Sequence, residues 1–69
     1  MRVAVVGITD PYARDQNASL KQWYQALLPA FEQARQAADL VIALADVGTG
    51  PGLWLAERLS DADLLLCAR

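Results

Sequence analysis

The residues best suited to chemistry lie in two short stretches rich in aspartate, glycine and proline. Asp10 follows an apolar run and precedes a proline, and Asp46 follows another apolar run. Asp46 opens a stretch with three alternating glycines, Gly48, Gly50 and Gly52. A carboxylate can bind a hard cation, and glycines let a ligand approach the backbone closely. Both residue types are also frequent in ordinary turns, where aspartate bonds to nearby amides and glycine adopts positive φ angles. Both interpretations stay open for this stretch.

Composition excludes several other kinds of site. The sequence has no histidine and a single cysteine, Cys67. It therefore lacks a Ser-His-Asp triad, a Cys-His pair, imidazole metal ligands, internal disulfides and thiolate clusters. Eight acidic residues against six basic ones give a net charge of -2, which removes the electrostatic case for nucleic-acid binding.

No segment of the sequence has the features of a membrane anchor or a secretory signal. The longest apolar run, residues 40–45, is far shorter than the roughly 20 residues that span a bilayer. The apolar run after Met1 is also too short for a signal peptide, and no small-residue cleavage site follows it. We expect a soluble chain that contacts no membrane, and its compartment stays open.

Continuous apolar runs predict three strands, near residues 2–7, 40–45 and 63–67. Runs of this kind are typical of strands that are buried on both faces of a parallel sheet. Residues 8–18 have the turn-rich composition of a loop.

Apolar residues at three- and four-residue spacing predict amphipathic helices near residues 19–37 and 52–59. Asn17 or Ser19 can cap the first helix. Pro29 lies inside its pattern without an amide donor, so we expect a kink or a break there.

The order strand, helix, strand, helix, strand predicts one three-stranded parallel sheet, because crossovers between parallel strands are right-handed. Ligands of such sheets bind outside the carboxyl ends of the strands, where Asp10, Asp46–Gly52 and Arg69 emerge. Two helices cannot cover both faces of the sheet. We therefore expect residues 1–69 to form a single partial α/β unit, a segment of a larger layered domain whose remainder is its partner.

Large side chains outside the candidate site have a packing interpretation. Trp23, Tyr24 and Phe31 recur at helical spacing, which is more typical of a core than of a ligand platform. Trp54 falls off the apolar positions of its helix, and either forms a contact surface or lies against other parts of the domain. Cys67 belongs to an apolar run, where we expect a buried and inert small side chain.

The stretch Asp46–Gly52 resembles the motif with which class I methyltransferases bind S-adenosylmethionine: an acid at a strand end, then glycines. In that family the motif normally follows the first strand, whereas here the strand at 2–7 precedes it. The helix after Gly52 is about one turn shorter than in the family, and no acid ends the third strand to hold a ribose. An S-adenosylmethionine-binding segment is therefore the alternative interpretation.

Nearly the whole chain resembles calcineurin-like metallophosphoesterases of the 5′-nucleotidase type. Residues 38–48 are similar to the strand that ends in Ser-His-x-Gly in that family, and residues 55–59 to the helix that follows. Residues 63–66 are similar to the family strand that runs into Gly-His-x-His. Residues 1–9 are similar to the family strand that comes before the one ending in Ser-His-x-Gly. The resemblance implies an α/β fold, a centre of divalent metal ions of the Mn or Zn type, and a small phosphate-type substrate.

The departures from this family fall on its metal ligands. Asp46 and Arg69 stand where the family has histidines, while Cys67 and Ala68 match its glycine pair. Asp46 remains a candidate metal ligand, but an arginine at 69 would repel a cation. We therefore expect no hydrolysis by this chain alone. A third interpretation, a structural α/β segment that binds nothing by itself, also stays open.

Overall fold

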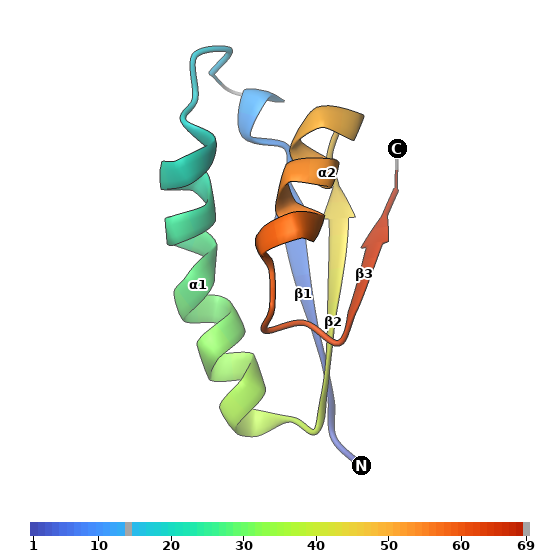
Figure 1. Ribbon diagram of the computed structural model, residues 1–69. Coiled ribbons are helices and arrows are strands. Elements are labelled where there is room, and N and C mark those ends of the chain that lie inside the picture. The colour runs from blue at the N-terminus through green and yellow to red at the C-terminus, as the bar shows by residue number, and fades with distance from the viewer. Residues whose placement is uncertain (14, 69) are drawn as a thin grey trace.

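Three parallel strands form one sheet in the computed structural model, which describes residues 1–13 and 15–68 (Figure 1). The strands are β1 (Val3–Thr9), β2 (Leu40–Asp46) and β3 (Leu64–Cys67), in the spatial order β1-β2-β3. Val3 pairs with Leu40 and Ile42 pairs with Leu64, both in parallel register. The predicted α/β class and the parallel sheet are confirmed.

β1 is longer than the sequence predicts, because Ile8 and Thr9 continue the strand instead of opening a loop. Ile8 pairs with Ala45 and Thr9 pairs with Asp46, and the Ile8 side chain is buried. Pairing with β2 and burial of Ile8 outweigh the turn-rich composition of the residues that follow. The connection to the first helix starts at Asp10 and contains the short 3-10 helix η1 (Pro11–Ala13).

The first helix, α1 (Leu20–Ala37), begins at Ser19, whose side chain accepts a hydrogen bond from the amide of Gln22. The predicted cap at Ser19 is thus confirmed. The expected break at Pro29 is wrong, since α1 continues through it as one helix. Pro29 lies on the exposed side of α1, where water can reach the carbonyl that lacks its donor. Phe31, fully buried, anchors the opposite side.

The second helix, α2 (Thr49–Arg58), begins three residues before the predicted start at 52. The turn predicted for Asp46–Gly52 is therefore wrong from Thr49 onward, where the chain is already helical. Pro51 lies in the first turn, the one place in a helix where a missing amide donor costs little.

Both helices cover the same face of the sheet (Figure 1). Successive right-handed crossovers that advance in one direction, from β1 to β2 to β3, place them there. The buried core lies between the sheet and the helices; it comprises Ile8, Phe31, Val41, Ala43, Ala45, Val47 and Leu55.

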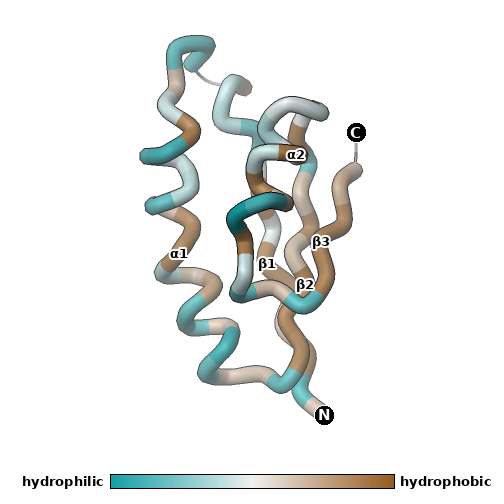
Figure 2. Tube along the Cα trace, in the orientation of Figure 1, coloured by the Kyte–Doolittle hydropathy of each residue, from teal (hydrophilic) through white to brown (hydrophobic). Residues whose placement is uncertain are grey.

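The opposite face of the sheet, which we call the open face, is apolar and exposed. Figure 2 shows hydrophobic residues along the strands. The side chains most exposed on this face are Val3, Val5, Leu44, Leu64 and Leu66, at 46–61% of their surface. Parallel sheets are normally covered on both faces, so the open face leaves apolar surface in unfavourable contact with water.

An aromatic cluster joins the two helices. The ring of Trp54 meets Tyr24 edge-on at 5.6 Å between centroids and Trp23 at 6.5 Å. The Arg58 guanidinium lies 4.2 Å from the Trp54 centroid, and the Tyr24 hydroxyl donates to the Arg58 carbonyl. Trp54, whose role the sequence left open, thus packs within the chain and fixes α2 against α1.

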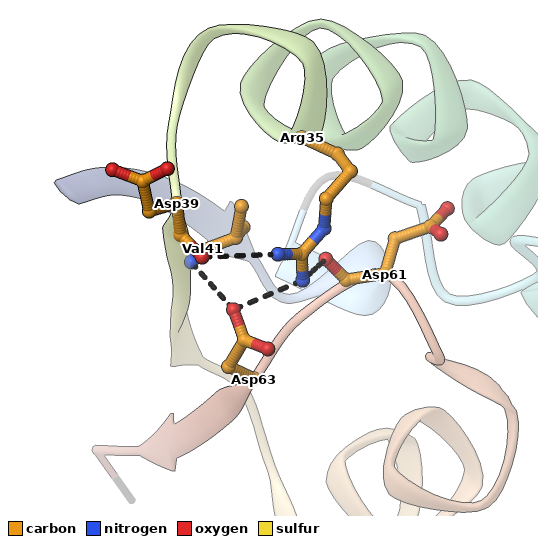
Figure 3. Close-up of polar contacts among 5 residues, drawn as sticks. All are labelled: Arg35, Asp39, Val41, Asp61 and Asp63. Carbon is orange, nitrogen blue, oxygen red and sulfur yellow. Dashed lines mark hydrogen bonds and ion pairs between the residues drawn. The ribbon is translucent and has the colours of Figure 1, made fainter. Parts of the chain in front are cut away.

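A polar network holds the amino ends of the strands (Figure 3). Arg35, in the last turn of α1, donates through Nη2 to the Asp61 carbonyl and to the Asp63 carboxylate, each at 2.9 Å. The same Asp63 oxygen accepts the amide of Val41 at 2.8 Å. The network lies at the opposite end of the sheet from the candidate site.

In the part of the chain that the structure describes, no helix is long and apolar enough to cross a membrane.

Candidate functional site

The candidate residues gather at the carboxyl edge, where β1 ends at Thr9 and β2 ends at Asp46. The Trp23 indole nitrogen donates to the Thr9 carbonyl at 3.1 Å, which fixes the end of β1 to α1. Beyond the strands, the edge is built from the loop after β1 and from the first turn of α2. Asp10 and Gly48, 38 residues apart in sequence, are in direct contact there.

Asp10 joins the two loops of the edge through its carboxylate. Its Oδ2 accepts the amide of Gly48 at 2.7 Å, and its Oδ1 accepts the amide of Tyr12 at 2.8 Å. Gly48 is the N-cap residue of α2 and has no side chain to cap the helix. Asp10 therefore supplies the N-terminal carboxylate that α2 lacks, in addition to stabilising its own turn.

The three glycines occupy different surroundings. A Cβ at Gly48 would lie 3.4 Å from Oδ2 of Asp10, and a Cβ at Gly52 would lie 3.4 Å from Val47 and 3.5 Å from Cys67. A Cβ at Gly50 would meet nothing within 4 Å. No glycine in the described part of the chain has positive φ, so left-handed turns do not explain them. Gly48 and Gly52 allow close packing, whereas Gly50 faces open space.

Asp46 lies exposed at the carboxyl end of β2, opposite Thr9. Arg69, expected beside it, falls outside the described residues. Within 1–13 and 15–68, no three His, Cys, Asp or Glu side chains lie together as metal donors. Both oxygens of Asp10 already accept backbone amides. A two-metal centre needs several ligands for each ion, so these residues do not fit the centre that the phosphoesterase resemblance implies.

A pocket of about 290 Å³ opens between α2 and β3, beside the first turn of α2. Its lining is mainly apolar and consists of Val47, Gly48, Thr49, Gly52, Leu53, Ala56, Leu65 and Cys67. Cys67 is exposed, so the expectation that it is buried is wrong. The thiol points to the helix-covered face, like its strand neighbour Ala45, and lies beside Gly52 of α2, which has no side chain to cover it.

Sequence reasoning missed the part of this pocket formed by α2 and β3. Only the three-dimensional placement of α2 beside the edge strand creates it, because the sequence does not distinguish the exposed Leu53 from the buried Leu55. A second hollow of about 380 Å³ lies over Thr9, Asp10, Pro11 and Ala13 on the other side of the edge.

Comparisons with protein families, with curated proteins and with solved structures yield no match for this chain. The phosphoesterase and methyltransferase resemblances therefore stay predictions.

Proposed function

We propose that the chain is a metallophosphoesterase-type α/β unit that keeps the ligand-binding edge of the sheet without a hydrolytic metal centre. The observation that carries the proposal is the arrangement of the two carboxylates at the carboxyl edge, Asp10 and Asp46. Asp46 ends the central strand at the family's ligand position, while both oxygens of Asp10 accept backbone amides, those of Tyr12 and Gly48. In this proposal, further elements of the same domain cover the open face.

The roles of Asp10 and Asp46 determine whether this edge can hydrolyse a phosphate ester. Hydrolysis of a phosphate ester by this family type relies on two cations that activate water and neutralise the phosphoryl oxygens. Asp10 instead holds the loop after β1 to the start of α2. In this proposal the edge, where ligands of open parallel sheets bind, holds a small phosphate-type molecule without breaking its ester bond.

Metal titration and a hydrolysis assay test this proposal. Calorimetry with Mn²⁺ and Zn²⁺ should give affinities weaker than micromolar, and AMP should release no phosphate. The matched variant Asp46→Ala should behave like the parent chain in both assays, with circular dichroism confirming the fold. Binding of two ions per chain at micromolar affinity, or hydrolysis that disappears in Asp46→Ala, would overturn the proposal.

A second candidate is binding of S-adenosylmethionine, and the environment of the glycines favours it. Gly52 permits close contact between α2 and the ends of β2 and β3, while Gly50 leaves the backbone open to a ligand. Glycine-rich turns that bind nucleotide-type ligands use glycines in these two ways, for close packing of helix against strand and for close approach of the ligand to the backbone.

Calorimetry with S-adenosylmethionine distinguishes the two candidates. Gly50→Val should abolish binding under the second candidate, because it fills the open space at the start of α2. Gly7→Val, at a glycine that also has nothing within 4 Å of its Cβ position, is the control and should bind normally. Absence of binding by the parent chain would eliminate this candidate.

A further inference from the structure

The pocket between α2 and β3 has apolar walls that face solvent. Leu53 and Ala56 of α2 form one wall, and Leu65 and Cys67 of β3 form the other. Leu53 exposes 64% of its surface, although a leucine is normally buried. A surface of this kind gains stability when an apolar group covers it.

Two small residues create the space. Gly52 has no side chain, and its Cβ position would lie within 3.5 Å of Val47 and Cys67 at the base of the pocket. Ala56 lies one turn further along α2 and offers only a methyl group. Because these positions are four residues apart, they lie on the same side of α2 and leave a hollow beside β3.

The volume and the lining restrict the occupant. A buried apolar cavity of about 150 Å³ accommodates benzene. The pocket, at about 290 Å³, has room for two fused rings. No charged side chain contributes to its lining, so an ionised ring would lose its hydration without compensation.

One end of the pocket is polar. Thr49 and Gly48 line it, and both belong to the start of α2 at the carboxyl edge. A ring nitrogen directed to this end has a hydrogen-bonding partner, whereas a purely hydrocarbon ring does not. The pocket is also continuous with the candidate site, where ligands of open parallel sheets bind.

We propose that this pocket binds the uncharged bicyclic heteroaromatic ring of a small molecule, of the size of indole or a purine. The ring lies between Leu53 and Leu65, and its polar edge points to Thr49. Neither Asp10 nor Asp46 lines the pocket, so the proposal does not rest on the metal chemistry of these carboxylates, but the pocket shares Gly48, Thr49 and Gly52 with the candidate site.

The single cysteine of the chain provides a direct test. Alkylation of Cys67 by iodoacetamide, followed by intact-mass spectrometry, should slow at least fivefold when indole or adenine saturates the pocket. The dependence on probe concentration should be saturable. Unchanged alkylation at millimolar concentrations of both probes would overturn the proposal.

Variants separate pocket binding from non-specific effects. Ala56→Leu fills the pocket and should abolish the shifts that the probes cause in amide NMR spectra, whereas Ala26→Leu, at an exposed position of α1, should retain them. Leu53→Ala removes one wall and should weaken binding several-fold. Equal binding by parent and Ala56→Leu would contradict the proposal. So would alkylation that slows with protein concentration alone, since a second copy of the chain would then be the occupant.

Discussion

The guanidinium of Arg35 lies 2.9 Å from Oδ2 of Asp63, and this ion pair joins the last turn of α1 to the residue before β3. The same oxygen accepts the amide of Val41, one residue into β2. One carboxylate oxygen therefore connects a helix end with the first residues of two neighbouring strands. The contact between Asp63 and Val41 thus brings the end of the β2–α2–β3 connection back to the start of β2.

Removing this carboxylate should destabilise the fold. We expect Asp63→Asn to lower Tm, because a neutral amide loses the ion pair with Arg35 and offers a weaker acceptor to Val41. Glu57→Gln is the control, since Glu57 contacts Arg58 at 3.4 Å on the surface and should matter little. Thermal unfolding followed by circular dichroism measures both; equal Tm values for the two variants would contradict a specific role of Asp63.

The stabilisation by Asp63 should also depend on pH. The amide of Val41 and the guanidinium of Arg35 hold the pKa of Asp63 below its usual range. A carboxyl group with a lowered folded-state pKa contributes its full stability above the unfolded pKa of about 4, and the contribution disappears as pH falls through the folded pKa.

The Tm difference between the parent chain and Asp63→Asn should therefore be constant near neutral pH and shrink below about pH 4. Added salt should reduce it in part, because the side chains of Asp63 and Arg35 are more than one-third exposed. A difference that grows on acidification would have the wrong sign for this assignment.

Asp10 should behave as the cap of α2 although it lies 38 residues away from Gly48 in sequence. Asp10→Ala should lower the free energy of unfolding by about 1 kcal/mol, the usual loss when a capping side chain is removed. Asp10→Asn keeps an acceptor oxygen and should lose less. Urea unfolding of both variants tests the prediction, and an Asp10→Ala chain as stable as its parent would refute it.

Two leucines of α2 should respond very differently to truncation. Leu55 is fully buried in the core, whereas Leu53 is 64% exposed in the pocket wall. Leu55→Ala should cost about 2–5 kcal/mol, which is most of the stability expected for so small a chain. Leu53→Ala should leave the fold intact. Chemical denaturation of both variants measures the contrast, and similar losses would mean that α2 is rotated relative to the structure described.

The open face should make the isolated chain self-associate. Val5 and Leu44, exposed on adjacent strands, belong to an apolar surface that water does not stabilise. We expect concentration-dependent oligomers, aggregation or a non-cooperative melt. Val5→Thr combined with Leu44→Thr should reduce association while retaining strand propensity. Analytical ultracentrifugation that finds a stable monomer with a sharp two-state melt for the parent would disprove the prediction.

The sequence by itself determined the elements and their parallel pairing. The run from Leu40 to Ala45 has the continuous hydrophobicity of a strand covered on both sides, and the spacing of Leu27 and Phe31 indicates one buried helix side. These patterns are local, and a crossover between consecutive parallel strands has one favoured hand. The order of the elements along the chain and their parallel pairing follow from them.

Only the tertiary structure decided how the edge is used. The contact of Asp10 with Gly48, the uncovered thiol of Cys67 and the pocket beside Ala56 each depend on where α2 lies over the sheet. Residue types along the chain are compatible with several positions of a short helix. The choice among them depends on packing between distant residues, such as Trp54 against Tyr24, which local periodicity does not encode.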